Sequence, residues 1–245
     1  MSFLLSRVRL VESRAALGNI PEGKILITTV NAHSYNLAQK DDLFAEALLG
    51  GDYLIPDGAG IVMACGWLGI SAPEERVAGW DLFCFDMQRV AEAKEHPCVM
   101  FMGSTPEVLS RIEARASKDY PGMKVVTFSP PFKEEFSDED SAAMVAAIND
   151  AKPDLLWIGM TAPKQEKWVW THWDELEIDC HTGTVGAVFD FYSGTIRRAP
   201  KWWQDHSLEW LFRLIHETRH TWKRYLLGNP LFVWNILKEK HRRNA

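Results

Sequence analysis

Short apolar segments alternate along this chain with longer stretches in which apolar residues recur at helical spacing. Most of the short segments are apolar throughout or β-branched, which is typical of strands buried on both faces. The expected strands are 24–30, 53–56, 98–102, 124–128, 155–160 and 184–189. The expected helices are 36–49, 58–68, 80–95, 105–119, 137–151 and 163–175. This alternation predicts an α/β fold with a doubly wound parallel sheet.

The character of the chain changes after residue 196. Residues 197–245 carry a net charge of +7 and five of the 11 Trp residues, whereas residues 1–196 carry −13. Within 207–227, apolar residues recur every three or four positions and basic residues occupy the other faces, which predicts a basic amphipathic helix for a membrane surface. A helix packed on the core or on another subunit fits the same pattern. We therefore predict a core, 1–196, and a helical appendage, 197–245.

Composition and charge exclude several classes of protein. The total charge of −6 and the isoelectric point near 5.8 argue against a general nucleic-acid binder. The four cysteines are widely spaced without a CxxC pair, so reduced thiols are expected. The N-terminal apolar stretch is soon interrupted by Arg7 and does not resemble a signal peptide. No apolar run is long enough to span a bilayer, and we expect the protein to work on the cytoplasmic side.

Candidate site residues follow the expected strands. In a parallel sheet, ligands bind at the carboxyl ends of the strands. The candidates there are Thr29, Asn31, Asp57, Gly103, Gln165, Gly186 and Asp190. Taken singly, such residues can also be turn or helix-capping residues, Asp57 included. The chain has no GxGxxG fingerprint and no GxxxxGK[ST] motif, which disfavours a nicotinamide-dependent oxidoreductase and a P-loop enzyme.

An acidic run, Asp138-Glu139-Asp140, contains the DxD pattern that holds a divalent metal in many sugar transferases. It stands at an expected helix N-terminus, where carboxylates favour the helix dipole. We therefore interpret the run as a helix start and predict no metal site.

Seven motifs in order resemble the WecG/TagA/CpsF family of bacterial glycosyltransferases, over residues 25–225. They are Thr29-x-Asn31, PDGAG at 56–60, ERVAGWDL at 75–82, PKQEKW at 163–168, GAVFDFYSG at 186–194, RAPKW at 198–202 and LEWLFRL at 208–214. The chain departs from the family's usual TPNAE, because Val30 replaces Pro and His33 replaces Glu.

The resemblance implies a Rossmann-like core and an inverting, metal-independent reaction. A hexose or N-acetylhexosamine would pass from a UDP-sugar to a polyprenyl-diphosphate-linked saccharide during cell-surface polysaccharide synthesis. The donor would be the only small molecule needed, without a further cofactor. The place of work would be the inner face of the plasma membrane, with anionic lipid as a partner. The alternative is a membrane-associated module that binds a nucleotide sugar without turnover. Self-association through the Trp-rich tail is a further expectation.

The resemblance also implies roles for individual residues. Asp57 would be the base, with Thr29 and Asn31 holding and orienting the sugars. Arg76 would contact the diphosphate and Gln165 the sugar or nucleotide, whereas Gly103, Gly186 and Asp190 would line the UDP pocket. In the appendage, the residues that would meet a lipid diphosphate or headgroups are Arg213, Arg219, Lys223 and Arg224. Alternatively, Arg76 pairs with its neighbours Glu75 or Asp81.

Overall fold

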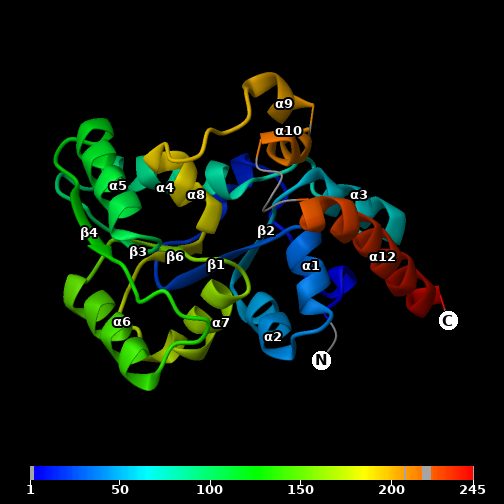
Figure 1. The fold of residues 1–245 in the computed structure, drawn as a ribbon, viewed down its shortest axis with the longest axis horizontal. Helices are drawn as coiled ribbons and strands as arrows, with labels where there is room; N and C mark the ends of the chain where they lie inside the picture. The colour runs from blue at the N-terminus through cyan, green and yellow to red at the C-terminus, as the bar shows by residue number, and fades with distance from the viewer. Residues whose placement is uncertain (1–2, 207, 217–221, 245) are drawn as a thin grey trace.

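The computed structural model describes residues 3–206, 208–216 and 222–244. Its centre is a six-stranded, all-parallel sheet with strand order β2-β1-β6-β5-β3-β4 (Figure 1). The strands are β1 (Ile25–Val30), β2 (Tyr53–Pro56), β3 (Cys98–Gly103), β4 (Lys124–Phe128), β5 (Leu155–Gly159) and β6 (His181–Thr184). The predicted α/β, Rossmann-like class is confirmed.

Helices connect the strands and continue after the sheet is complete. The α-helices and the π-helical segment η4 are α1 (Ala32–Ala38), α2 (Asp42–Gly50), α3 (Ala59–Leu68), α4 (Gly79–Ala93), α5 (Pro106–Asp119), α6 (Asp138–Ala151), α7 (Lys164–Thr171), α8 (Gly186–Ser193), α9 (Lys201–Asp205), α10 (Glu209–His216), η4 (Lys223–Leu227) and α12 (Gly228–Asn244). Short 3₁₀ turns are η1 (Leu5–Arg7), η2 (Ala15–Asn19) and η3 (Trp173–Glu175).

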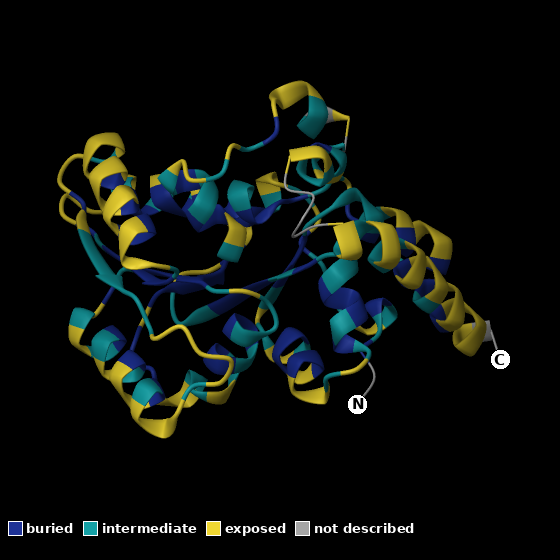
Figure 2. Cartoon of the chain, in the orientation of Figure 1, coloured by how far each residue is buried: buried dark blue, intermediate teal, exposed yellow. Residues whose placement is uncertain are grey.

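Alternate residues of each central strand point to opposite faces of the sheet, and both faces are covered by helices. On one face, Ile27 and Trp157 pack in a cluster with side chains of α4, α5 and α8. On the other face, Leu26 and Leu156 join a cluster with α6 and α7, and Val30 joins a cluster with α1, α2 and α3. Figure 2 shows the buried sheet between exposed outer helix faces. Because helices cover both faces of the sheet, the side chains on both faces of the central strands are mostly apolar.

The expected strand at 184–189 is wrong. The sixth strand is β6, His181–Thr184, and the apolar run after it forms the beginning of α8. Val188 and Phe189 are buried because this helix packs on the sheet. Periodicity alone does not separate a short buried helix from a buried strand, and β6 itself, with the sequence HTGT, is polar.

The expected helix at 36–49 is two helices. Asn31 caps α1 and accepts hydrogen bonds from the backbone amides of His33 and Ser34, at 3.0 and 3.1 Å. Asp41 caps α2 through a 3.0 Å hydrogen bond from the amide of Phe44. Each cap satisfies amides that have no partner within their own helix, so the chain starts a new helix after each of the two residues.

The expected helix at 207–227 is described as α10 and η4, with 217–221 outside the described residues. Helix α12 follows and packs beside α1 and α3, where Phe232 and Ile236 are buried (Figure 1). The end of the chain therefore contributes to a core cluster. The division of the chain at residue 196 stays a prediction. Among the described residues, no helix has both the length and the apolar character for crossing a membrane.

A buried ion pair lies at the amino end of β6, away from the strand ends that carry the candidate site. The Nδ1 atom of His181 lies 3.1 Å from Oδ1 of Asp86, and its Nε2 lies 2.8 Å from the carbonyl of Pro21. Both side chains of the pair are 1% exposed. Burial works against the imidazolium, but the hydrogen bond and charge of Asp86 outweigh it and raise the pKa of His181. The charged imidazole can donate to both acceptors.

We expect His181→Gln to lower the free energy of unfolding by about 1–3 kcal/mol, because Asp86 loses the charged imidazole but keeps its 2.8 Å ion pair with Arg89. Because the pKa of His181 is higher in the folded protein than in the unfolded chain, the ion pair stabilises the fold fully below the unfolded pKa of about 6.5. This stabilisation disappears as the pH rises through the pKa of His181 in the folded protein. Urea unfolding of both proteins between pH 5 and 9 measures the effect. The difference between them should shrink as the pH rises. A His96→Gln control, at an exposed position, should match the wild-type protein.

Candidate active site

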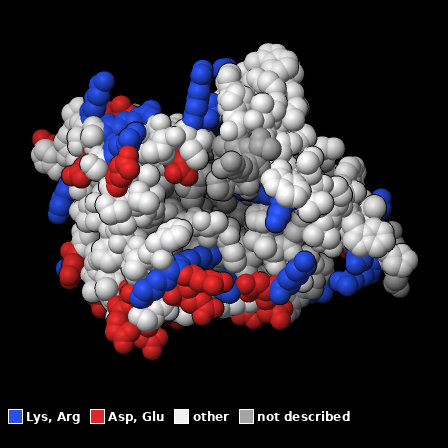
Figure 3. Space-filling model, viewed as in Figure 1, with Lys and Arg blue, Asp and Glu red and all other residues white. Residues whose placement is uncertain are grey.

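A cavity of about 990 Å³ lies at the carboxyl ends of the strands. It is centred where β1 and β6 lie side by side, and the helices that follow these strands, α1 and α8, cover opposite faces of the sheet. Open α/β sheets bind ligands at such a crevice. Figure 3 shows the hollow from one side, with acidic side chains gathered below it over α6 and α2.

Asp57 follows β2 and lies in the wall of this pocket. Its backbone amide donates to the carbonyls of Val30 and Ile55, at 2.8 and 3.0 Å, which fixes the residue at the strand end. Burial raises the pKa of the Asp57 carboxyl, and the Arg76 guanidinium works in the opposite direction. Gly58 follows with φ of 122°, a conformation that glycine adopts without strain. A carboxyl with a raised pKa in a pocket is suited to accepting a proton.

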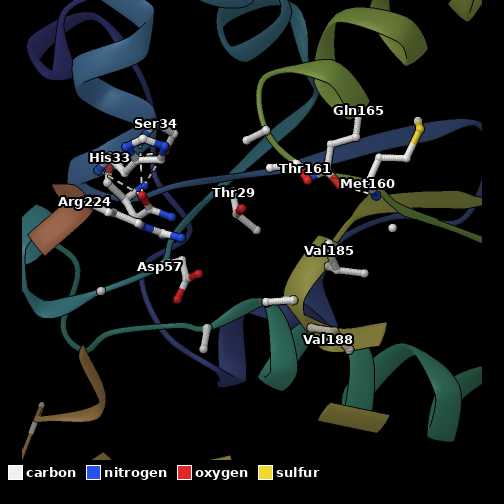
Figure 4. Close-up of a pocket in the computed structure, with 18 of the residues that line it drawn as sticks. Thr29, His33, Ser34, Asp57, Met160, Thr161, Gln165, Val185, Val188 and Arg224 are labelled. Atoms are coloured by element: carbon white, nitrogen blue, oxygen red, sulfur yellow. Dashed lines mark hydrogen bonds between the residues drawn. The ribbon is translucent and has the colours of Figure 1, made fainter. Parts of the chain in front are cut away.

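Thr29 and Asn31 also line the pocket, as predicted. Thr29 is half-buried near the end of β1 and lies between Asp57 and the 160–165 segment in the view of Figure 4. The Oδ1 atom of Asn31 is used by the α1 cap described above. Asn31 therefore holds the local backbone and can offer its Nδ2 group to a ligand.

His33, on α1, and Arg224, on η4, lie next to each other at this site although they are far apart in the sequence. Figure 4 shows the two side chains next to each other, with Arg224 directed toward Asp57. Burial, and then the charge of Arg224, lower the pKa of His33 to about 4. The imidazole is therefore neutral at physiological pH, and Arg224 supplies the positive charge on this side of Asp57.

Arg76 lines the pocket in an ion-pair network with the appendage. Its Nη1 lies 3.2 Å from Oε2 of Glu209, and Oε1 of Glu209 lies 3.4 Å from Nε of Arg198. The alternative pairing of Arg76 with Glu75 or Asp81 is wrong, because Arg14 lies 3.5 and 3.3 Å from those two carboxylates. The partner comes instead from α10, so two guanidinium groups share one carboxylate at the pocket wall.

Gln165 is buried and lines the pocket at the start of α7. Its Oε1 accepts a 3.0 Å hydrogen bond from the Met160 amide, and its Nε2 donates to Oε1 of Glu166 at 2.7 Å. Gly186 also lines the pocket, and a Cβ atom there would collide with the Met160 carbonyl and press on Gln165. The glycine therefore lets α8 approach the Gln165 amide closely.

Of the remaining predicted pocket residues, Asp190 lines the cavity and Gly103 does not. Gly103 ends β3 with φ of 125°, and a Cβ atom there would collide with Gly159 on the neighbouring strand. Its role is close strand packing beside Ser104, which does line the pocket. Asp190 accepts a 3.2 Å hydrogen bond from the Thr195 hydroxyl through its carbonyl, and so also holds the turn after α8.

The predicted tail contacts divide into three groups. Arg213 and Arg224 line the same pocket as Asp57. Lys223 lies outside that lining, with Nζ 5.6 Å from the ring centre of Trp222. Arg219 lies outside the described residues.

The acidic run forms the first turn of α6. Ser137 and Asp140 form a reciprocal capping box, and Asp140 lies 2.6 Å from Nζ of Lys133. Hydrogen bonds hold the pKa values of Glu139 and Asp140 below their usual range. The run therefore caps a helix. In the described part of the chain, no group of three or more His, Cys, Asp or Glu side chains is arranged to hold a metal ion.

The pocket residues that the sequence analysis did not select as site candidates include Arg198, Glu209 and Glu166. Arg198 and Glu209 belong to the RAPKW and LEWLFRL motifs, so the motifs indicated these residues. The sequence did not indicate that Glu209 pairs with both Arg76 and Arg198. From the sequence, Glu166 can be interpreted as an acidic residue in the first turn of a helix. Its burial becomes evident only in the folded structure.

Comparison with known proteins gives a consistent result. The model of the "Glycosyl transferase WecG/TagA/CpsF family" matches residues 2–245. An N-acetylglucosaminyldiphosphoundecaprenol N-acetyl-beta-D-mannosaminyltransferase of Bacillus subtilis (strain 168) is 29% identical over 220 residues, covering 90% of this chain and 82% of that protein. A protein of the same name from Staphylococcus aureus (strain MW2) is 27% identical over 241 residues, covering 96% and 89%. With its strand-end pocket and a family match along almost its whole length, the chain belongs to the WecG/TagA/CpsF family of glycosyl transferases.

Proposed function

We propose that this protein transfers a hexose or N-acetylhexosamine from a UDP-sugar to a polyprenyl-diphosphate-linked saccharide, with inversion and without a metal. The observation that carries the proposal is that a half-buried carboxyl, Asp57, shares one pocket with two guanidinium groups from distant segments of the chain, Arg76 and Arg224. The names of the relatives make N-acetylglucosamine on a lipid diphosphate the first acceptor to test, and N-acetylmannosamine the first sugar.

In this mechanism, Asp57 takes the proton from the acceptor hydroxyl while that oxygen attacks the anomeric carbon. Attack from the face opposite UDP breaks the bond to the diphosphate and inverts the configuration. The leaving diphosphate gains negative charge, which Arg76 and Arg224 stabilise. Glu209 moves off Arg76 when the diphosphate arrives, since both are anionic partners of the same guanidinium. A volume of about 990 Å³ is at the upper end for small-molecule sites and suits two substrates.

The test is a panel of UDP-sugars assayed for UDP release with a short-chain lipid-diphosphate N-acetylglucosamine acceptor. We expect release with one donor class, only when the acceptor is present, and without added divalent cation. Binding of UDP with no release for any donor would support the non-catalytic module and contradict this proposal. Release that stops with a chelator would contradict the metal-independent reaction.

We also propose that the tail rests on an anionic membrane on the cytoplasmic side. Exposed apolar side chains gather on η4 and α12, namely Leu226, Leu227, Leu231, Trp234 and Leu237. Lys223, Arg224, Lys238 and Arg242 lie on the same elements. Apolar side chains flanked by basic ones are suited to the interface of an anionic bilayer. A tail on the membrane would bring the lipid-linked acceptor close to the pocket, which Arg224 lines.

Replacing Leu227 and Trp234 together by Ser should weaken membrane binding at least tenfold, since each buried large apolar side chain contributes about 1.5–3 kcal/mol. The two side chains are 61% and 57% exposed, so the fold should tolerate the change. Flotation with phosphatidylglycerol vesicles measures the binding, with phosphatidylcholine vesicles as the weak-binding arm. A Leu43→Ser variant on α2 is the matched control. Equal flotation of all three proteins would contradict a membrane-facing tail.

A further inference from the structure

Glu166 is a buried carboxyl at the active-site pocket that the mechanism above does not use. It lines the pocket, yet its side chain is almost fully enclosed, with 1% of the residue exposed. It lies next to Gln165 on α7 and accepts the 2.7 Å hydrogen bond from the Gln165 amide on Oε1. Among the described residues, its Oε2 has no hydrogen-bond partner. A buried charged carboxylate with an unpartnered oxygen is costly.

In the part of the chain that the structure describes, no cation compensates Glu166 from the elements that pack around it. On α7, Lys167 lies 2.9 Å from Asp41, and Lys164 lies over the ring of Phe136, 3.6 Å from its centre. On α2, Asp42 and Glu46 are exposed, and on η3, Glu175 pairs with His172. None of these charges contributes to the pKa of Glu166, which burial raises to about 7 against the hydrogen bond from Gln165.

The face of the sheet that α7 covers carries threonine hydroxyl groups on β1 and β6 beside its apolar side chains. Thr182 and Thr184 of β6 point to the same face, opposite to Trp157, which packs where Gly183 leaves room. Leu26 pairs with Thr182, so Thr28 of β1 follows on that face as well. The hydroxyls of all three threonines are fully buried and lack a partner in the described residues. Thr184 lies close enough to Glu166 to affect the pKa of that carboxyl. A protonated Oε2 of Glu166 can therefore donate to the Thr184 hydroxyl, which gives both unpartnered oxygen atoms a hydrogen bond.

The Gln165 amide is held at both of its ends. The Met160 amide fixes its oxygen at 3.0 Å, and Glu166 fixes its nitrogen. The Met160 N–H can only donate, so it requires the oxygen of the Gln165 amide at that end and leaves the nitrogen facing Glu166. The second Nε2 hydrogen is then the one available to a ligand.

From this geometry we propose that Glu166 is a positioning residue that acts in its neutral, protonated form. It fixes the donor end of Gln165 for the nucleotide diphosphate of the donor and keeps the adjacent pocket wall free of negative charge. The inference rests on the UDP-sugar site proposed above. Ionisation of Glu166 puts a negative charge beside a site for an anionic diphosphate and weakens binding.

The test compares UDP affinity in the wild-type protein, Glu166→Gln and Glu166→Leu by calorimetry from pH 6 to 8.5. The glutamine variant reproduces the neutral carboxyl at every pH, so the wild type should match it at pH 6 and bind UDP about three- to tenfold more weakly than it at pH 8.5. The second phosphate ionisation of UDP, near pH 6, is shared by both proteins and cancels in the ratio. The leucine variant cannot hold Gln165 and should bind about tenfold more weakly at all pH values.

A double variant distinguishes positioning from a general structural effect. If Glu166 acts through Gln165, Gln165→Ala should weaken UDP binding, and adding Glu166→Leu should weaken it no further. A constant ratio between wild type and Glu166→Gln across the pH range would overturn the inference, as would additive losses in the double variant. These binding measurements need no sugar transfer. Absence of UDP release by a wild-type protein that binds UDP therefore counts against the proposed reaction alone.

Discussion

Asp57→Asn is expected to lower the rate of sugar transfer by about 10²–10⁴-fold, the usual contribution of a positioned general base. Asparagine keeps the shape of the side chain and the backbone hydrogen bonds to Val30 and Ile55 at the end of β2. It cannot accept the proton of the acceptor hydroxyl. UDP binding should remain within a few-fold of the wild type, because the guanidinium groups of Arg76 and Arg224 are unchanged. The measurement is initial UDP release with saturating donor and acceptor, alongside calorimetry with UDP.

The control for this change is Asp174→Asn, which removes an exposed carboxylate on η3 and should leave the rate unaltered. The pH dependence gives a second check. Burial raises the pKa of Asp57, so kcat/KM of the wild type should fall on the acidic side as the base becomes protonated. Near wild-type turnover in Asp57→Asn would exclude Asp57 as the base.

Arg76→Ala is expected to lower kcat/KM for the donor by about 10²–10³-fold, the range typical of losing one preorganised group that stabilises developing charge. The loss has two parts. The diphosphate loses a charged donor, and Glu209 keeps only Arg198 as its described partner. Steady-state kinetics with varied UDP-sugar measure the effect, and thermal unfolding checks that the fold is retained.

Two further variants separate these parts. Arg76→Lys keeps the charge but lacks the planar fork, so its kcat/KM should lie between those of Arg76→Ala and the wild type. Glu209→Gln releases both guanidinium groups without removing either one, and should lower KM for the donor or leave it unchanged. If Glu209→Gln instead matched the loss in Arg76→Ala, the Arg76–Glu209 pair would be needed as a structural unit, and direct diphosphate contact by Arg76 would be contradicted.

Much of the fold could be predicted because its signals are local. Five strands are apolar or β-branched runs bounded by turns, and the structure has them within a residue or two of the expected positions. The sixth could not be found this way. β6 has the sequence HTGT, and its threonines are buried because pairing with β1 and β5 places them inside the sheet. Helices α1 and α2 were merged for a related reason, since Asn31 and Asp41 cap them through side-chain hydrogen bonds that periodicity does not reveal.

The candidate site also contains residues that the sequence predicted correctly and a residue that it did not. The strand-end rule and the motifs were sufficient to select Thr29, Asn31, Asp57 and Gln165, all of which line one cavity. They were insufficient for Gly103, which packs against Gly159 instead. The roles of these residues in transfer stay predictions until the variants are measured.

The sequence by itself determined the parallel α/β sheet, the strand-end position of Asp57 and the charge contrast between the two parts of the chain. These properties follow from local periodicity, turn chemistry and composition. Only the tertiary structure decided which distant groups meet. It pairs Arg76 with Glu209, brings Arg224 beside His33 and Asp57, and buries Glu166 near the Thr184 hydroxyl. Ion pairing and burial depend on distances between segments far apart in the chain, and those distances exist only once the chain has folded.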